Sequence, residues 1–98
     1  MFKKLLFVLL LMVIAVSGCD SKTKEELLQE GVQFSADANY RGAIVLFKNA
    51  LEKDPNFTEA RLHLGDAYLK TGKYQNAESE YKKVLLQDPA DKNIIFKL

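Results

Sequence analysis

The residues with the most reactive side chains in this 98-residue sequence are one cysteine, Cys19, and one histidine, His63. A single cysteine cannot form an intramolecular disulfide. His63 stands between Leu62 and Leu64, with no second histidine, cysteine or carboxylate cluster at the spacing of metal ligands. The glycines are isolated from one another, so no phosphate-binding loop is predicted. We therefore expect no catalytic residues, no cofactor and no metal, and a protein that is not an enzyme.

The N-terminal segment has the layout of a secretory signal peptide. Met1–Lys4 is a short basic start, residues 5–16 are uninterrupted apolar sequence, and the small residues Ser17 and Gly18 follow. The apolar run is shorter than the roughly 20 residues that a bilayer-spanning helix needs. We expect residues 1–18 to be a cleaved signal peptide. An uncleaved N-terminal anchor is the alternative.

The stretch Val16-Ser17-Gly18-Cys19 resembles the bacterial lipobox, which lipoprotein signal peptidase reads. The resemblance implies that the Cys19 thiol receives a diacylglyceryl group, that cleavage falls between Gly18 and Cys19, and that the new amino terminus is acylated, with palmitate for example. One acyl chain binds only marginally, each buried CH₂ contributing about 0.8 kcal/mol, so stable anchoring takes two or more. An ordinary secretory signal with an unmodified Cys19 is the alternative. Asp20 resembles an inner-membrane retention signal of enteric-type bacteria, which favours the periplasmic face of the inner membrane over the outer membrane.

The charge of the chain excludes a strongly basic binding surface. The full sequence has 14 Lys and Arg against 13 Asp and Glu, and removal of Lys3 and Lys4 leaves 12 against 13, a net charge of −1. A nearly neutral chain lacks the electrostatic footprint of a nucleic-acid-binding protein. It also lacks the polybasic patch that holds proteins to anionic lipids. We expect no nucleic-acid partner, and membrane attachment through the lipid alone.

Apolar residues recur at three- and four-residue steps after residue 23, and no strand pattern of period two is present. Thr23 and Glu26 have capping-box spacing, and Gly72 suits a left-handed helix end. The predicted helices are Lys24–Ala36, Tyr40–Lys53, one from the expected cap pair Asn56 and Glu59 to Thr71, Tyr74–Gln87, and a fifth that opens near Asp91.

Several residues repeat at a fixed interval of 34. The pairs are Gly31 and Gly65, Tyr40 and Tyr74, Ala43 and Ala77, Leu51 and Leu85, Asp54 and Asp88, and Pro55 and Pro89. Such a period marks a repeat architecture whose units bury their apolar faces only by stacking. We expect Gly31 to let Ala43 approach within the first helix pair, and Gly65 to let Ala77 approach in the second.

This pattern resembles the tetratricopeptide repeat (TPR), a family with a 34-residue unit of two helices. The signature positions are filled by Gly31, Phe34, Ala43, Phe47, Ala50 and Pro55, and then by Leu64, Gly65, Tyr68, Ala77, Tyr81 and Pro89. Leu27, Arg61, Glu30 and Val84 depart from the pattern. The resemblance implies an all-α solenoid of antiparallel helix hairpins. Its expected parts are 1–18 as lipoprotein signal peptide, 19–23 as lipidated tether, 24–57 as unit one, 58–91 as unit two, and 92–98 as the start of a truncated unit three.

The resemblance also implies a concave face lined by the first helix of each unit. The candidate partner groove there consists of Leu28, Val32, Leu62, Asp66, Leu69 and Phe96, with Ser35 beside it. An apolar row in a groove could receive an amphipathic helix or an extended peptide. The alternative is that these residues only pack neighbouring units. Val45 and Leu46, which replace the Ser79 and Glu80 of unit two, could touch a membrane or a partner, or form a slightly apolar helix face.

Lipobox and repeats together resemble the TPR lipoproteins of bacterial exopolysaccharide and PEP-CTERM protein-sorting systems. We expect a membrane-anchored scaffold for protein–protein interactions in the bacterial cell envelope, with a protein or peptide partner. The alternatives are an outer-membrane-assembly or secretion-pilot lipoprotein, and a soluble peptide-binding TPR module. Because Ile94, Ile95, Phe96 and Leu98 have little to pack on, we expect further TPR units, or a homodimer formed through this edge.

Overall fold

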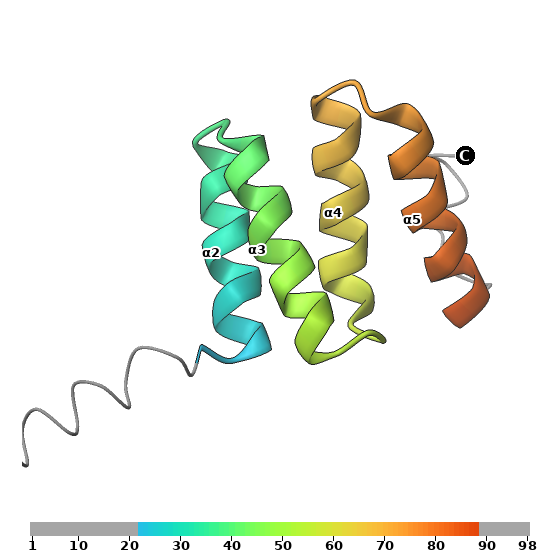
Figure 1. Cartoon of the computed structure of the whole chain (residues 1–98), viewed down its shortest axis with the longest axis horizontal. Helices are drawn as coiled ribbons and strands as arrows, with labels where there is room; N and C mark the ends of the chain where they lie inside the picture. The colour runs from blue at the N-terminus through green and yellow to red at the C-terminus, as the bar shows by residue number, and fades with distance from the viewer. Residues whose placement is uncertain (1–21, 89–98) are drawn as a thin grey trace, which may run out of the picture.

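The computed structural model describes residues 22–88, which form four α-helices and, within this range, no strand. The helices are α2 (Lys24–Ala36), α3 (Tyr40–Lys53), α4 (Thr58–Lys70) and α5 (Tyr74–Gln87). Figure 1 shows them in a row, each antiparallel to the one before it. The all-α solenoid of helix hairpins is confirmed, and three helices have the expected bounds. The predicted signal peptide, Cys19 and the predicted start of a third unit lie outside the described residues.

Contacts between the helices follow their order in the chain. α2 packs on α3, α3 on α4, and α4 on α5, while α2 also touches α4. Among the described helices, α5 contacts only α4. This is the nearest-neighbour arrangement of a solenoid, in which each hairpin is stabilised by the contacts between its own two helices and by its contacts with the adjacent hairpin.

The two hairpin turns have the same backbone conformation but different residues. Gly72 follows α4 with φ +76°, and Ala38, its equivalent 34 residues earlier, has φ +60°. Glycine adopts this left-handed region without strain, whereas an alanine there brings its Cβ too close to the carbonyl oxygen. In both turns a backbone N–H closes the helix end: Asn39 donates to the carbonyl of Phe34, and Lys73 to that of Tyr68, each at 2.8 Å.

Side-chain caps begin the two helices of the first hairpin. The Thr23 hydroxyl accepts a hydrogen bond from the Glu26 amide at 3.1 Å, as the capping-box spacing predicts. Asn39 caps α3 by accepting from the Gly42 amide at 3.1 Å. The predicted Asn56 cap of α4 is wrong, because Phe57 is the N-cap residue and makes no side-chain hydrogen bond. The Asn56 carbonyl oxygen of the side chain instead accepts from the Gln87 amide of α5 at 3.0 Å.

The hydrophobic core runs along the seams between the helices. Its largest fully buried side chains are Tyr81, Phe47 and Val84. A Cβ atom added to Gly31 would lie 2.5 Å from Cε1 of Phe47, and one added to Gly65 would lie 2.5 Å from Cε1 of Tyr81. The glycines were expected to make room for Ala43 and Ala77. These alanines are buried, but the atoms nearest to the glycines belong to the aromatic rings, since the rings reach farther across the seam.

Candidate interaction surface

The two hairpins meet through a ring stack between α3 and α4. The rings of Phe47 and His63 have centroids 5.5 Å apart and an interplanar angle of 20°. Aromatic pairs at this separation contribute about 0.5–1.5 kcal/mol beyond the area they bury. His63 is therefore an inter-helix packing residue. The described residues contain no group of three or more His, Cys, Asp and Glu side chains that could hold a metal ion.

Beside this stack lies a hollow of about 350 Å³ on α2, α3 and α4. Its lining residues are Val32, Ser35, Ala36, Tyr40, His63, Asp66, Ala67 and Lys70. The volume is at the lower end of the range for ligand pockets in proteins, roughly 300–1,000 Å³. The lining combines apolar side chains with hydroxyl, imidazole, carboxylate and ammonium groups, so the hollow can accept one side chain of a partner and hydrogen-bond it.

The carboxylate of Asp66 is held in place from α5. The Tyr81 hydroxyl donates a hydrogen bond of 2.5 Å to Oδ1 of Asp66. Burial, and secondly this hydrogen bond to a carboxylate, raise the pKa of Tyr81 far above its ordinary value. Tyr81 thus stays protonated at every physiological pH and remains a donor. The second hairpin thereby fixes a polar group at the edge of the hollow.

The structure distributes the described groove residues over four environments. Val32 and Asp66 line the hollow, Leu69 is 37% exposed on α4, and Leu62 is half-buried against the core. Leu28 is only 3% exposed and belongs to the core. Phe96, like the predicted lipid-attachment residue Cys19 and Gly18 before it, lies outside the described residues. Binding of a partner by this set stays a prediction.

Sequence reasoning did not place Tyr40 and Lys70 at this surface. Tyr40 begins α3 and Lys70 ends α4, yet both line the hollow. The recurrence of Tyr40 as Tyr74 was the available signal for the first of them. No local pattern marks Lys70, since its position depends on how α4 lies against the first hairpin.

Comparison with known proteins identifies the fold. The profile of the tetratricopeptide repeat family matches residues 27–95. The chain belongs to the tetratricopeptide repeat family. TPR units form a non-catalytic protein-interaction fold, and no described helix of this TPR protein is long and apolar enough to cross a membrane.

Two curated proteins are similar to this TPR chain over 53 residues, which is 54% of its length, at 38% identity. One is the human "Antiviral innate immune response effector IFIT1", and the other is "Superkiller protein 3" of Schizosaccharomyces pombe. The matched part is 11% of the first protein and 4% of the second. The chain therefore spans only a small part of the relatives that it matches.

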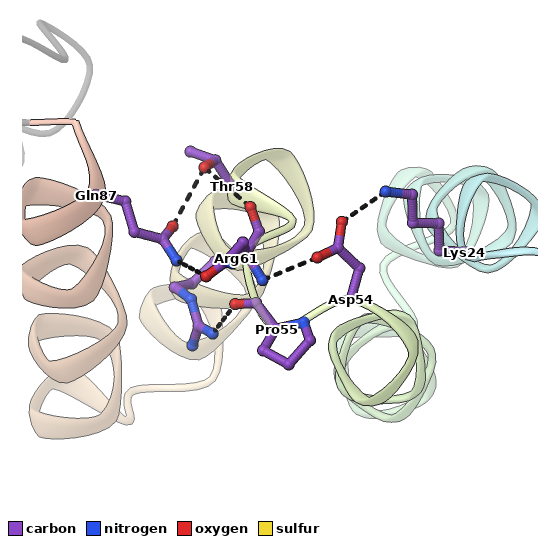
Figure 2. Close-up of polar contacts among 7 residues, drawn as sticks. Lys24, Asp54, Pro55, Thr58, Arg61 and Gln87 are labelled. Carbon is purple, nitrogen blue, oxygen red and sulfur yellow. Dashed lines mark hydrogen bonds and ion pairs between the residues drawn. The ribbon is translucent and has the colours of Figure 1, made fainter.

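Near the loop between α3 and α4, polar contacts join the helix ends within each of the two TPR units (Figure 2). The Lys24 ammonium lies 2.5 Å from a carboxylate oxygen of Asp54 and 4.9 Å from the centroid of the Phe57 ring. Their hydrogen bond lowers the pKa of Asp54 and raises that of Lys24. The Thr58 hydroxyl lies 3.2 Å from Oε1 of Gln87. These contacts connect the start of each unit's first helix to the end of its second helix.

Arg61 makes the most buried of the described ion pairs. Its guanidinium lies 2.6 Å from Oε2 of Glu80, and each of the two side chains is 12% exposed. The other end of the guanidinium donates to the Pro55 carbonyl at 2.7 Å, as Figure 2 shows. Leu27 and Leu46 occupy the equivalent positions of unit one. These two positions between the paired helices thus carry apolar residues in the first hairpin and an ion pair in the second. The pairing with Glu80 accounts for the departure of Arg61 from the family pattern.

Proposed function

We propose that this chain is a lipid-anchored TPR scaffold of the bacterial cell envelope that binds a protein or peptide partner at the hollow between its hairpins. The repeats themselves indicate a scaffold for protein–protein interaction. The observation that carries the proposal is the mixed lining of the hollow, formed jointly by α2, α3 and α4. Such a site exists only when both hairpins are stacked, so a partner can bind there only to the assembled pair of repeats.

The lining limits which partner side chain fits. The Lys70 ammonium stands at the hollow as a donor, while the His63 imidazole and the Ser35 hydroxyl can each donate or accept. Asp66 already accepts a hydrogen bond from Tyr81, which uses part of its acceptor capacity. The Lys70 ammonium, which can only donate, therefore favours an acidic or amide side chain on an extended or helical segment of the partner.

The anchoring half of the proposal is supported by the lipobox-like sequence that ends in Cys19, and the inner-membrane preference by Asp20. Val45 gives an additional contact candidate, since its side chain is 56% exposed on α3 while its equivalent in unit two is Ser79. An envelope scaffold of this kind suits polysaccharide export or protein sorting of the PEP-CTERM type.

Site-specific photo-cross-linking in a bacterial host tests the binding half. A photoreactive amino acid at Lys70 is compared with the same group at Lys53, which is exposed at the far end of α3. The proposal expects a protein adduct from position 70 and none from position 53. Equal adducts from both, or none from position 70, would reject the hollow as the binding site.

Metabolic labelling with a fatty-acid analogue tests the anchoring half separately. The wild-type chain should incorporate label and fractionate with membranes, and Cys19→Ser should lose both properties. A wild-type chain that is unlabelled and soluble would instead support the soluble peptide-binding module. The cross-linking result does not depend on this outcome.

A further inference from the structure

The outer face of α5 carries four side chains at four-residue steps: Tyr74, Glu78, Lys82 and Leu86. Residues four apart are neighbours along a helix, so these four form one ridge, here called the α5 ridge. Tyr74 is 68% and Leu86 84% exposed, more than any other large apolar side chain among the described residues. Between them the Lys82 ammonium lies 2.9 Å from the Glu78 carboxylate. The order along the ridge is apolar, acidic, basic, apolar.

The α5 ridge lies at the end of the row of described helices. α5 contacts only α4 among them, through the face that carries Ala77, Tyr81 and Val84. Figure 1 shows no further described helix beyond α5. A shallow hollow of about 370 Å³ runs along the ridge, lined by Gln75, Glu78, Ser79, Lys82, Lys83 and Leu86. This face has room for side chains from an opposing helix.

Comparison with α3 shows that the α5 ridge does not suit another hairpin stacked as α4 is on α3. The equivalent residues of α3 are Tyr40, Ile44, Lys48 and Glu52. Ile44 is 8% exposed, one turn from Phe47, whose ring stacks on His63 of α4. Glu78 takes the place of Ile44 in unit two. A helix packed in the same way would bury that carboxylate together with its partner Lys82, and burial of an ion pair carries a desolvation cost that the apolar Ile44 avoids.

We propose that the occupant of the α5 ridge is a second copy of this chain, with the two α5 helices antiparallel about a two-fold axis at the level of Glu80. This axis places Tyr74 opposite Leu86 of the second copy, and Glu78 opposite Lys82 of the second copy. Two-fold symmetry repeats each contact, so the interface has two ion pairs at its centre and an apolar contact at each end. The ridge is complementary to itself in this orientation.

The expected association is weak. One 14-residue helix from each copy contributes the contact, whereas a standard stable interface buries about 800 Å² on each partner. The central ion pairs are largely exposed and serve orientation more than affinity. Anchoring to one membrane, which rests on the proposed function, would raise the local concentration of copies. The interface itself is testable without that assumption.

Charge reversal tests the arrangement directly. The full chain is studied in a mild detergent by sedimentation equilibrium over a range of protein concentrations. Glu78→Lys places two cations opposite each other, and Lys82→Glu places two anions opposite each other. Each substitution should weaken dimerisation by roughly tenfold or more, as two like-charge contacts per dimer replace two ion pairs. The double variant Glu78→Lys, Lys82→Glu should dimerise like the wild type.

Mixing the two single variants provides the matched control, because each then faces its complement. The mixture should form heterodimers more tightly than either variant forms homodimers. The double substitution Tyr74→Ala, Leu86→Ala should weaken the wild-type dimer. All variants share the same N-terminal segment. If the chains associated through that segment instead, every variant would dimerise as strongly as the wild type, which would also overturn the proposal. A monomeric wild type, for instance because residues 89–98 cover the ridge, would overturn the proposal, as would a double variant that fails to recover. Cross-linking at Lys70 should be unaffected by these variants, so the two proposals fail independently.

Discussion

The ion pair between Arg61 and Glu80 gives the sharpest test of how the seams are stabilised. Unit one carries Leu27 and Leu46 at the two equivalent positions. Arg61→Leu and Glu80→Leu, singly and together, therefore convert the ionic seam into the apolar seam that the chain already uses in its first hairpin.

The magnitudes follow from the partners that each substitution leaves behind. Arg61→Leu leaves Glu80 with Lys83, whose ammonium is 3.4 Å away, and leaves the Pro55 carbonyl to water, so we expect a loss of about 2 kcal/mol. Glu80→Leu leaves a guanidinium, 12% exposed, whose Nε is already buried without a hydrogen bond in the described structure, and we expect a loss of about 3 kcal/mol.

The double variant removes both charges and adds apolar contact. Replacement of a buried pair by apolar residues of similar size is often neutral or stabilising. We therefore expect the double variant to lie within about 1 kcal/mol of the wild type, with a coupling free energy of about 4 kcal/mol between the two positions.

Urea unfolding followed by far-ultraviolet circular dichroism measures these free energies, with the slope of the transition checked for each variant. The exposed pair Lys22 and Glu30, 56% and 35% exposed, serves as control with an expected coupling of about 0.2–1 kcal/mol. Additive losses in the Arg61 and Glu80 cycle would refute the reasoning, because the pair would then act as two independent surface charges.

Three further predictions concern the turns, the glycine contacts and the pH dependence. Gly65→Ala should lower the free energy of unfolding by about 1–3 kcal/mol in urea titrations, because the new Cβ would meet the Tyr81 ring at 2.5 Å. Ala38→Gly should raise it by up to about 1 kcal/mol, and Gly72→Ala should lower it by about 1 kcal/mol, since both turns need a left-handed residue. Because Lys24 lowers the pKa of Asp54, this carboxylate stabilises the folded chain above the ordinary pKa of 3.8, and the contribution is lost as the pH falls through the lower folded-state pKa. Asp54→Asn should flatten that acid-side loss of stability, measured as urea midpoints against pH; an unchanged profile would contradict the pairing.

Much of the fold could be predicted because its determinants are local. The bounds of α2, α3 and α5 follow from the spacing of apolar residues, and the turn at Gly72 follows from its residue type. The start of α4 could not be predicted, since the side chain of Asn56 bonds to Gln87, 31 residues later. A competing partner from another helix overrode the local capping preference.

The candidate site was predictable only in part, for the same reason. Val32 and Asp66, predicted at the groove from the TPR resemblance, line the hollow, and their role in binding stays a prediction. Leu28, predicted at the groove, is buried in the core, because apolar residues on the inner side of a first helix serve packing before binding. Lys70 enters the hollow from the end of α4, and only the three-dimensional angle between hairpins reveals this. Lipidation at Cys19 remains a prediction from sequence.

The order in which the helices touch also determines how the chain comes apart. Because α5 contacts only α4 among the described helices, the second hairpin can open while α2 and α3 keep each other's contacts. Amide hydrogen exchange should then be fastest in α5 and slowest in α3, which is covered on both sides. A pulling force applied at residue 88 would unzip the hairpins one after the other. Contacts between near neighbours in the sequence also close quickly, so refolding after such an event should be fast.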